Sequence, residues 1–263
     1  MPTERPANSC ALLFRVRQLA LQSVLENEMN KKPLVTLCAA TLISPGLVST
    51  AGSETDSPTP VSIEKEPHHS LTFENDRVVV FHLQLQPNEA TETHRHRSFY
   101  AYFSLDPVTI SNEVIGHSPV ITQLEPGELR TSKGGFNVAE RNESNTRADI
   151  FIVQPKKSDG DGFSMPLALP MHDAGTIEQY TGPTMRVYSL AIASAGRLEE
   201  HTEKYDTLAI ALKDSNVRET VAGNSPADWN MKAGDTRWIP RGTIHSESNF
   251  GSAPAALMVF EFN

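Results

Sequence analysis

The fold is decided by residues 234–249, which read GDTRWIPRGTIHSESN and follow the pattern G-x5-P-x-G-x2-H-x3-N. Gly234 suits a turn with backbone angles that other residues avoid, and Pro240 with Gly242 suits a second tight turn. We expect this second turn to deliver His245 onto the next strand, with its side chain pointing inward.

An upstream segment supplies two further polar side chains. His201 and Glu203 follow Gly196 and lie two positions apart. Because side chains alternate along a strand, both point to one face of it. Two histidines and a carboxylate that converge from two strands suit a divalent metal, so His201, Glu203 and His245 are candidate metal ligands. The alternative is a charged pair of His201 and Glu203, with His245 as a buried hydrogen-bonding residue.

These two patterns resemble the sequence motifs of the cupin superfamily. The second motif is complete in residues 234–249, whereas the first, G-x5-H-x-H-x3-4-E-x6-G, is altered. Glu203 stands where the family usually has its second histidine, and Thr207 stands where it usually has its glutamate. The resemblance implies an all-β fold, the double-stranded β-helix or jelly-roll barrel. The His-x-Glu…His set also resembles, more weakly, the ligands of 2-oxoglutarate-dependent oxygenases.

The chain repeats itself at a constant offset of 107 residues. Three pairs of positions are related by it: His201 and His94, Glu203 and His96, and His245 and Val138. The turn between the motifs repeats as well, since GHSP at 116–119 corresponds to GNSP at 223–226. An ungapped offset across both motifs indicates two tandem cupin domains, a bicupin. We divide the chain into an upstream extension with a signal peptide (1–51), a linker (52–60), an N-terminal cupin domain (61–155), a second linker (156–183) and a C-terminal cupin domain (184–263).

The first repeat keeps His94 and His96 as candidate ligands. Tyr100 takes the place of the motif glutamate, and Val138 takes the place of the motif-two histidine. Glu140 shares the strand face of Val138 and can serve as a third ligand. The other interpretation is a hydrogen-bonded plug of His94, His96 and Tyr100 in a barrel that has lost its metal. We favour the plug and expect this barrel to bind metal more weakly than the second, or not at all.

Other polar residues receive simpler interpretations. Tyr205 and Glu247 face inward in the second repeat and are candidates for catalytic proton transfer. Of the five histidines outside both motifs, we interpret four as surface residues: His68, His69, His117 and His172.

Charge and cysteine content exclude several classes of protein. The formal net charge is −9 without a basic cluster, which argues against nucleic acid and anionic membranes as partners. The two cysteines, Cys10 and Cys38, precede the first expected strand, so disulfides and zinc–thiolate sites within the domains are excluded.

The N-terminal region resembles a secretory signal. Residues 29–32 read MNKK and open an apolar run that ends in small residues at 49–51. A basic start, a short apolar centre and small residues before the cleavage point predict cleavage after Ala51, with translation starting at Met29. The alternative is that residues 11–25 form a real N-terminal helix. We expect a periplasmic or secreted protein.

Cupins host many unrelated activities, so the fold alone does not choose a function. We expect an exported bicupin metalloprotein with one divalent transition metal (Fe, Mn, Ni or Zn) in the C-terminal barrel. It would be an oxygenase, isomerase or decarboxylase that acts on a small organic molecule. The alternative is a non-catalytic bicupin that binds a small ligand or a sugar. Expected partners are the small molecule and, through sheet edges, a second copy of the chain.

Overall fold

The computed structural model describes residues 59–156, 163, 167 and 169–263, and the regular secondary structure of this part is almost entirely β-strand. The expected signal peptide and the extension before it lie outside the described residues. The described residues belong to one compact unit. Within the described part of the chain, no helix has the length and apolar character needed to cross a membrane.

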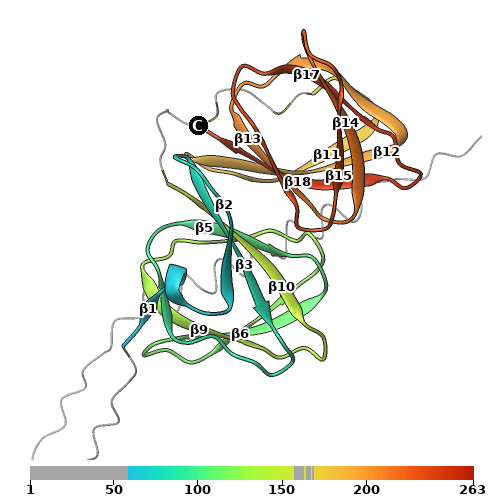
Figure 1. Ribbon diagram of the computed structural model, residues 1–263. Helices are drawn as coiled ribbons and strands as arrows, with labels where there is room; N and C mark the ends of the chain where they lie inside the picture. The colour runs from blue at the N-terminus through green and yellow to red at the C-terminus, as the bar shows by residue number, and fades with distance from the viewer. Residues whose placement is uncertain (1–58, 157–162, 164–166, 168) are drawn as a thin grey trace, which may run out of the picture. The chain divides into compact units, whose positions relative to one another are not determined.

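The first repeat forms a barrel of two five-stranded sheets (Figure 1). Its elements are β1 (Val61–Ser62), the 3-10 helix η1 (Ile63–Lys65), β2 (His69–Glu74), β3 (Val78–Leu85), β4 (His94–His96), β5 (Tyr100–Ser104), β6 (Val108–Val114), β7 (Val120–Leu124), β8 (Arg130–Ser132), β9 (Phe136–Asn142) and β10 (Ala148–Pro155). One sheet has the order β1-β4-β9-β6-β7 and the other β2-β3-β10-β5-β8.

The second repeat forms one curved eight-stranded sheet. Its strands are β11 (Met171–Thr181), β12 (Met185–Thr202), β13 (Asp206–Ala211), β14 (Ser215–Val221), β15 (Ala227–Met231), β16 (Thr236–Ile239), β17 (Ile244–Asn249) and β18 (Ala255–Phe262). The order is β15-β14-β17-β12-β18-β13-β16, and β11 pairs with β12. Thus the segment 156–183, expected to be a linker, contributes a strand to this sheet.

The strand register confirms the two-barrel prediction. His94 pairs with Val138 across β4 and β9, and His201 pairs with His245 across β12 and β17. The 107-residue offset also extends beyond the motifs. His69 on β2 pairs with Leu83, and the equivalent Thr176 on β11 pairs with Leu190. The two barrels therefore place their strands at equivalent positions.

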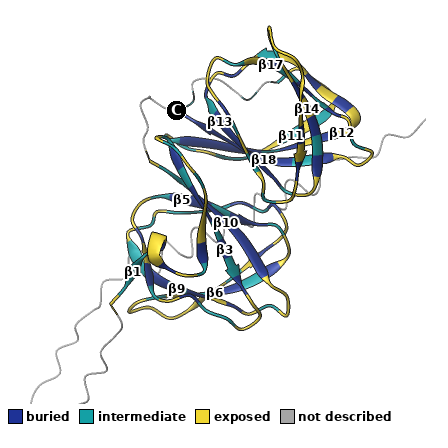
Figure 2. Ribbon diagram, viewed as in Figure 1, coloured by how far each residue is buried: buried dark blue, intermediate teal, exposed yellow. Residues whose placement is uncertain are grey.

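The two faces of a core strand pack in different hydrophobic clusters. In β3, Val78 and Val80 point to a hydrophobic cluster shared by both repeats, whereas Phe81 and Leu83 point into the first barrel. Strand β18 has the same two faces. Phe260 packs in the shared cluster, whereas Leu257 and Val259 point into the second barrel. Burial accordingly changes from residue to residue along many strands (Figure 2).

The turn glycines of the motif touch the opposite repeat. Gly234 has a φ of +88°, and a Cβ there would lie 2.6 Å from the Phe151 ring of the first repeat. Gly127, its equivalent at φ +69°, lies against Leu212 of the second repeat. The backbone angle therefore favours glycine at both positions, and the close approach of the Phe151 ring adds to this preference at Gly234.

The asparagine that ends the motif closes each barrel at the same place. Asn142 and Asn249 are both buried, and each donates its side-chain amide to backbone carbonyls. The acceptors are Leu85 and Thr146 for the first, and Ile192, Ala193 and Ala253 for the second. The asparagine of the motif thus has a structural role, because its amide donates hydrogen bonds to backbone carbonyls in each barrel.

Replacing Asn249 with alanine should therefore lower the free energy of unfolding by about 2–4 kcal/mol, because buried carbonyls lose their donor. Urea denaturation would measure the change. Asn230→Ala, on the exposed side of β15, is the matched control and should change stability by less than about 0.5 kcal/mol. Equal effects of the two substitutions would contradict the structural role of Asn249.

Candidate functional site

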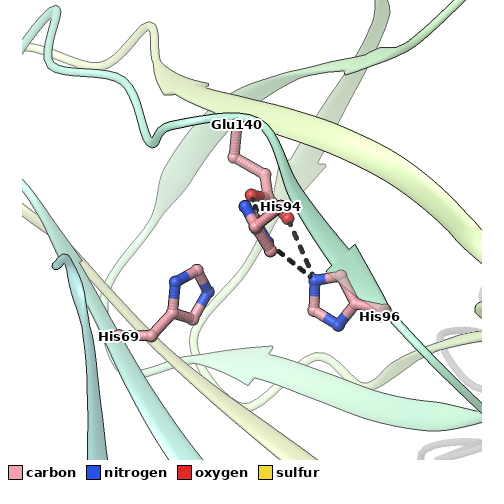
Figure 3. A group of neighbouring side chains, drawn as sticks. All are labelled: His69, His94, His96 and Glu140. Atoms are coloured by element: carbon pink, nitrogen blue, oxygen red, sulfur yellow. Dashed lines mark hydrogen bonds and ion pairs between the residues drawn. The ribbon is translucent and has the colours of Figure 1, made fainter. Parts of the chain in front are cut away.

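The first barrel brings four potential metal ligands together. They are His69 from β2, His94 and His96 from β4, and Glu140 from β9. All four side chains are buried, and one donor atom from each lies within 4.8 Å of the others. His69 comes from one sheet and the other three from the facing sheet, so the cluster spans the barrel interior (Figure 3).

The distances within this cluster fit a single ion. Nε2 of His94 lies 3.0 Å from Nε2 of His96. The Glu140 oxygens lie 3.3 Å from Nε2 of His94 and 3.6 Å from Nε2 of His96. Donors bound about 2.1 Å from one ion are separated by about 3.0–3.4 Å, depending on the angle between them. Small adjustments of the side chains would therefore complete a coordination shell.

The hydrogen bonds outside the cluster set the histidine tautomers. Nδ1 of His94 donates to the carbonyl of Glu92 at 3.0 Å, and Nδ1 of His69 lies 2.6 Å from a carboxylate oxygen of Glu66. Because these oxygens accept, each Nδ1 carries a proton and each ring points its Nε2 toward the cluster. Nε2 of His69 is buried and has no hydrogen-bond partner within the described part of the chain. A bound cation would satisfy it.

The carboxylates around this cluster are held in the ionised form. Burial alone would raise the pKa of Glu140, but contact with His96 and the charges of His94, His96 and His69 outweigh it and lower the pKa to about 2. Burial acts in the same direction on Glu66, where hydrogen bonds from His69 and His68 lower the pKa to about 2. Ionised carboxylates and neutral imidazoles are the forms that bind divalent metals.

The interpretation of His69 as a surface residue is wrong, because it is only 6% exposed. The repeat comparison gave no signal for it, since the equivalent residue is Thr176. The strand pattern is also weak: β2 has a register shift between Leu71 and Phe73, and Leu71 points outward. His117 and His172 are exposed as expected.

Tyr100 does not complete the expected plug by hydrogen bonding to the histidines. Its ring stacks on His96 with centroids 4.2 Å apart, and its hydroxyl interacts with Ser132. His94 and His96 instead face Glu140, the residue that we considered as a third ligand.

The second barrel brings together the three residues expected from the motifs. Nε2 of His245, on β17, lies 3.1 Å from an oxygen of Glu203, and Nε2 of His201 lies 3.7 Å from the same oxygen. Nδ1 of His201 donates to the carbonyl of Glu199 at 2.8 Å, as His94 does to the equivalent carbonyl in the first barrel. This set of two histidines and one carboxylate also fits a metal.

The second cluster differs from the first because neighbouring carboxylates provide hydrogen-bond partners for both ring nitrogens of His245. Nδ1 of His245 lies 2.9 Å from Glu219, a buried carboxylate on β14 that the sequence analysis did not identify. Burial lowers the pKa of His245, but its hydrogen bonds with Glu203 and Glu219 raise it to about 10. The hydrogen bonds of His245 with Glu203 and Glu219 match the alternative in which it is a buried hydrogen-bonding residue, and His201 lies 3.7 Å from Glu203, as the charged pair of that alternative requires. The first cluster has the stronger features of a metal site, because it has four potential ligands and two buried ring nitrogens without a partner among the described residues, Nε2 of His69 and Nδ1 of His96.

The two expected proton-transfer residues lie in different surroundings. Glu247 is buried, and burial raises its pKa to about 7 although the charge of His245 opposes this shift. It is the repeat equivalent of Glu140. The ring of Tyr205 contacts Phe163 and lies 5.5 Å from the Arg186 guanidinium carbon.

A small cavity adjoins the first cluster at Glu140. It has a volume of about 20 Å³, which is room for one water-sized group. Five aliphatic residues and five polar or aromatic ones line it: Leu83, Ile110, Leu124, Ile150 and Ile152, with Tyr100, Tyr102, Asn112, Thr122 and Glu140. No lysine or arginine is among these described residues, so Glu140 supplies the only charge that they bring to the wall.

Comparisons with known proteins give similarity in structure only. No protein-family model and no curated protein sequence matches the chain. AerE from Microcystis aeruginosa has a TM-score of 0.57 at 15% identity, covering 78% of this chain and 98% of its own. A single-residue variant of the oxalate decarboxylase of Bacillus subtilis has a TM-score of 0.54 at 11% identity, with 74% and 72% covered. A formate complex of Lactobacillus farciminis oxalate decarboxylase has a TM-score of 0.53 at 14% identity, with 74% and 80% covered.

Proposed function

We propose that this chain, which has the tandem two-barrel fold of the bicupins, is a metal-dependent enzyme whose reactive metal binds in the first barrel. The observation that carries the proposal is the unpartnered Nε2 of His69, which faces the donors of His94, His96 and Glu140. Three imidazoles and one carboxylate suit Fe(II), Mn(II), Ni(II) or Zn(II). This choice of barrel reverses the expectation from the motifs.

The substrate that we propose is a small organic molecule with little charge. A metal in this position would polarise a bound oxygen atom or activate a bound water. The cavity beside Glu140 would hold one small group of the substrate next to that carboxylate. Oxalate carries two negative charges, and the described residues of the cavity wall offer no cation to balance them besides the metal. We therefore propose a chemistry different from that of the oxalate decarboxylases with the same fold.

The second barrel would bind a divalent metal more weakly through His201, Glu203 and His245. A metal there must displace the proton that His245 shares with Glu203, so binding competes with an existing ion pair. Glu247 would remain its group for proton transfer. Export to the periplasm or the medium and association into a homodimer also remain proposals, supported by the signal-like residues 29–51 and by the exposed sheet edges expected of the fold.

Metal content should follow the first cluster. Protein purified without added metal is expected to contain about one divalent ion per chain by elemental analysis. His96→Ala should remove this ion, whereas His245→Ala should keep it. His82→Gln is the control, because His82 is a half-buried histidine of the same barrel that bonds to Asp149 outside the cluster.

The opposite outcome would be equally clear. If His245→Ala empties the protein and His96→Ala does not, the reactive metal belongs to the second barrel. If wild-type protein binds no divalent metal even after dialysis against it, the non-catalytic binding protein becomes the better description.

A further inference from the structure

Glu66 lies next to the first cluster but is not one of its four potential metal ligands. It follows η1, its side chain is completely buried, and it begins the short segment that leads into β2. One carboxylate oxygen lies 2.6 Å from Nδ1 of His69. The same oxygen accepts the backbone N–H of His68 at 2.9 Å.

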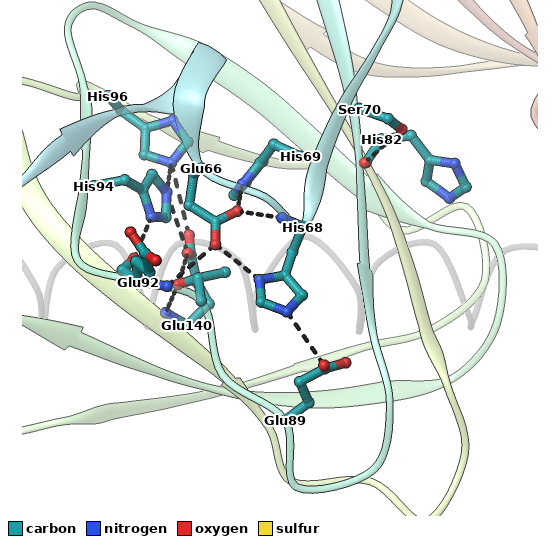
Figure 4. Close-up of polar contacts among 11 residues, drawn as sticks. Glu66, His68, His69, Ser70, His82, Glu89, Glu92, His94, His96 and Glu140 are labelled. Carbon is teal, nitrogen blue, oxygen red and sulfur yellow. Dashed lines mark hydrogen bonds and ion pairs between the residues drawn. The ribbon is translucent and has the colours of Figure 1, made fainter.

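The second oxygen of Glu66 reaches another histidine through the backbone. It accepts the N–H of Glu92 at 3.1 Å, and the carbonyl of Glu92 accepts Nδ1–H of His94 at 3.0 Å. Figure 4 shows how these bonds connect the residue to both histidines from outside the cluster. The second oxygen of Glu66 also lies 2.8 Å from Nδ1 of His68.

We infer that Glu66 is the positioning residue of the first metal site, which fixes His69 directly and His94 through Glu92 in the tautomer whose Nε2 faces the ion. This inference rests on the proposed function, because it requires that the first cluster bind metal. A carboxylate on the outer nitrogen also makes the imidazole a more basic ligand. Two of the three histidines would thus depend on one carboxylate.

The second repeat supports a specific role rather than an inherited feature of the fold. The 107-residue offset places Asp173 at the position of Glu66 and Thr176 at the position of His69. The side chain of Asp173 is 69% exposed and pairs with the exposed His172. The buried carboxylate therefore occurs only in the repeat that has the histidine for it to hold, among the residues that the structure describes.

The first barrel also contains a matched control. Asp149 is a buried carboxylate that lies 3.0 Å from Nε2 of His82, whose ring stacks on Phe151 of the shared cluster rather than facing the metal ligands. Asp149→Asn and Glu66→Gln both change a carboxylate beside a histidine into its amide. Similar losses of stability are expected, but only Glu66→Gln should affect the metal.

The test measures affinity of the metal-free protein for Co²⁺ or Zn²⁺ by competition with a chelator. Glu66→Gln should weaken binding by about 10–100-fold, whereas Asp149→Asn should leave it unchanged. Wild-type affinity in Glu66→Gln would overturn the inference but leave the proposed function standing. Absence of any first-barrel binding in the wild type would instead reject the proposed function.

A second measurement needs no substitution and so does not depend on folding of the variant. Nitrogen-15 NMR of the histidine rings in the metal-free wild type should show the proton on Nδ1 of both His69 and His94. A proton on Nε2 of either ring would contradict the inference.

Discussion

Removing the metal from the wild-type protein is expected to lower its melting temperature by about 8–16 °C. A ligand present at about 1,000 times its Kd stabilises the native state by about 4 kcal/mol, and each kcal/mol moves the melting temperature of a unit of this size by about 2–4 °C. The structural reason is that His69 comes from the sheet facing the other three donors. The ion would therefore tie the two sheets of the first barrel together.

Calorimetry of the protein with Zn²⁺ and after chelation would measure this difference. His96→Ala should show a clearly smaller difference, because its first cluster loses one of its four donors. His245→Ala should show the full difference. A shift that disappears in His245→Ala but persists in His96→Ala would assign the stabilising ion to the second barrel.

The second large effect concerns Glu140 and Glu247, two glutamates at equivalent repeat positions. We expect their replacement by glutamine to change the free energy of unfolding in opposite directions. In the metal-free protein at pH 8, Glu140→Gln should destabilise the fold and Glu247→Gln should stabilise it, each by on the order of 3 kcal/mol. The magnitudes follow from pKa values of about 2 for Glu140 and about 7 for Glu247, against 4.5 when unfolded.

The pH dependence of each variant gives an independent check on the sign. The low pKa of Glu140 contributes stability above pH 4.5, and this contribution is lost as the pH falls toward 2. The raised pKa of Glu247 costs stability that grows as the pH rises from 4.5 to 7, so the gain in Glu247→Gln should vanish near pH 4.5. Urea denaturation at about pH 4.5 and about pH 8 would measure both, and effects of the same sign at the higher pH would contradict the assignment.

The sequence predicted the fold because the deciding features are local. Gly234, His245 and Asn249 have the spacing of the motif. The constant offset of 107 residues then identified the equivalent positions in the first repeat. Strand β11 was missed because most of its residues are exposed, so it lacks the alternation that identifies a half-buried strand.

The site was predicted less completely, because its added residues belong to one repeat each. His69 and Glu66 have no counterparts of the same kind at Thr176 and Asp173, so the comparison between repeats could not reveal them. Glu219 has Asn112 as its equivalent and was missed for the same reason. Which carboxylates and histidines meet across a barrel depends on the pairing of distant strands, and the motif spacing does not contain that information.

The division of each core strand into two faces has a consequence for how the two halves could change after a duplication. The residues that join the repeats, such as Val80 and Phe260, point to the shared cluster, while the neighbouring positions point into one barrel alone. A substitution inside one barrel therefore leaves the joining surface intact. One half could gain a histidine at position 69 while the other placed a carboxylate beside His245, and both would still fold against each other. Alternation along the strand thus allows the two interiors to change independently within a single chain.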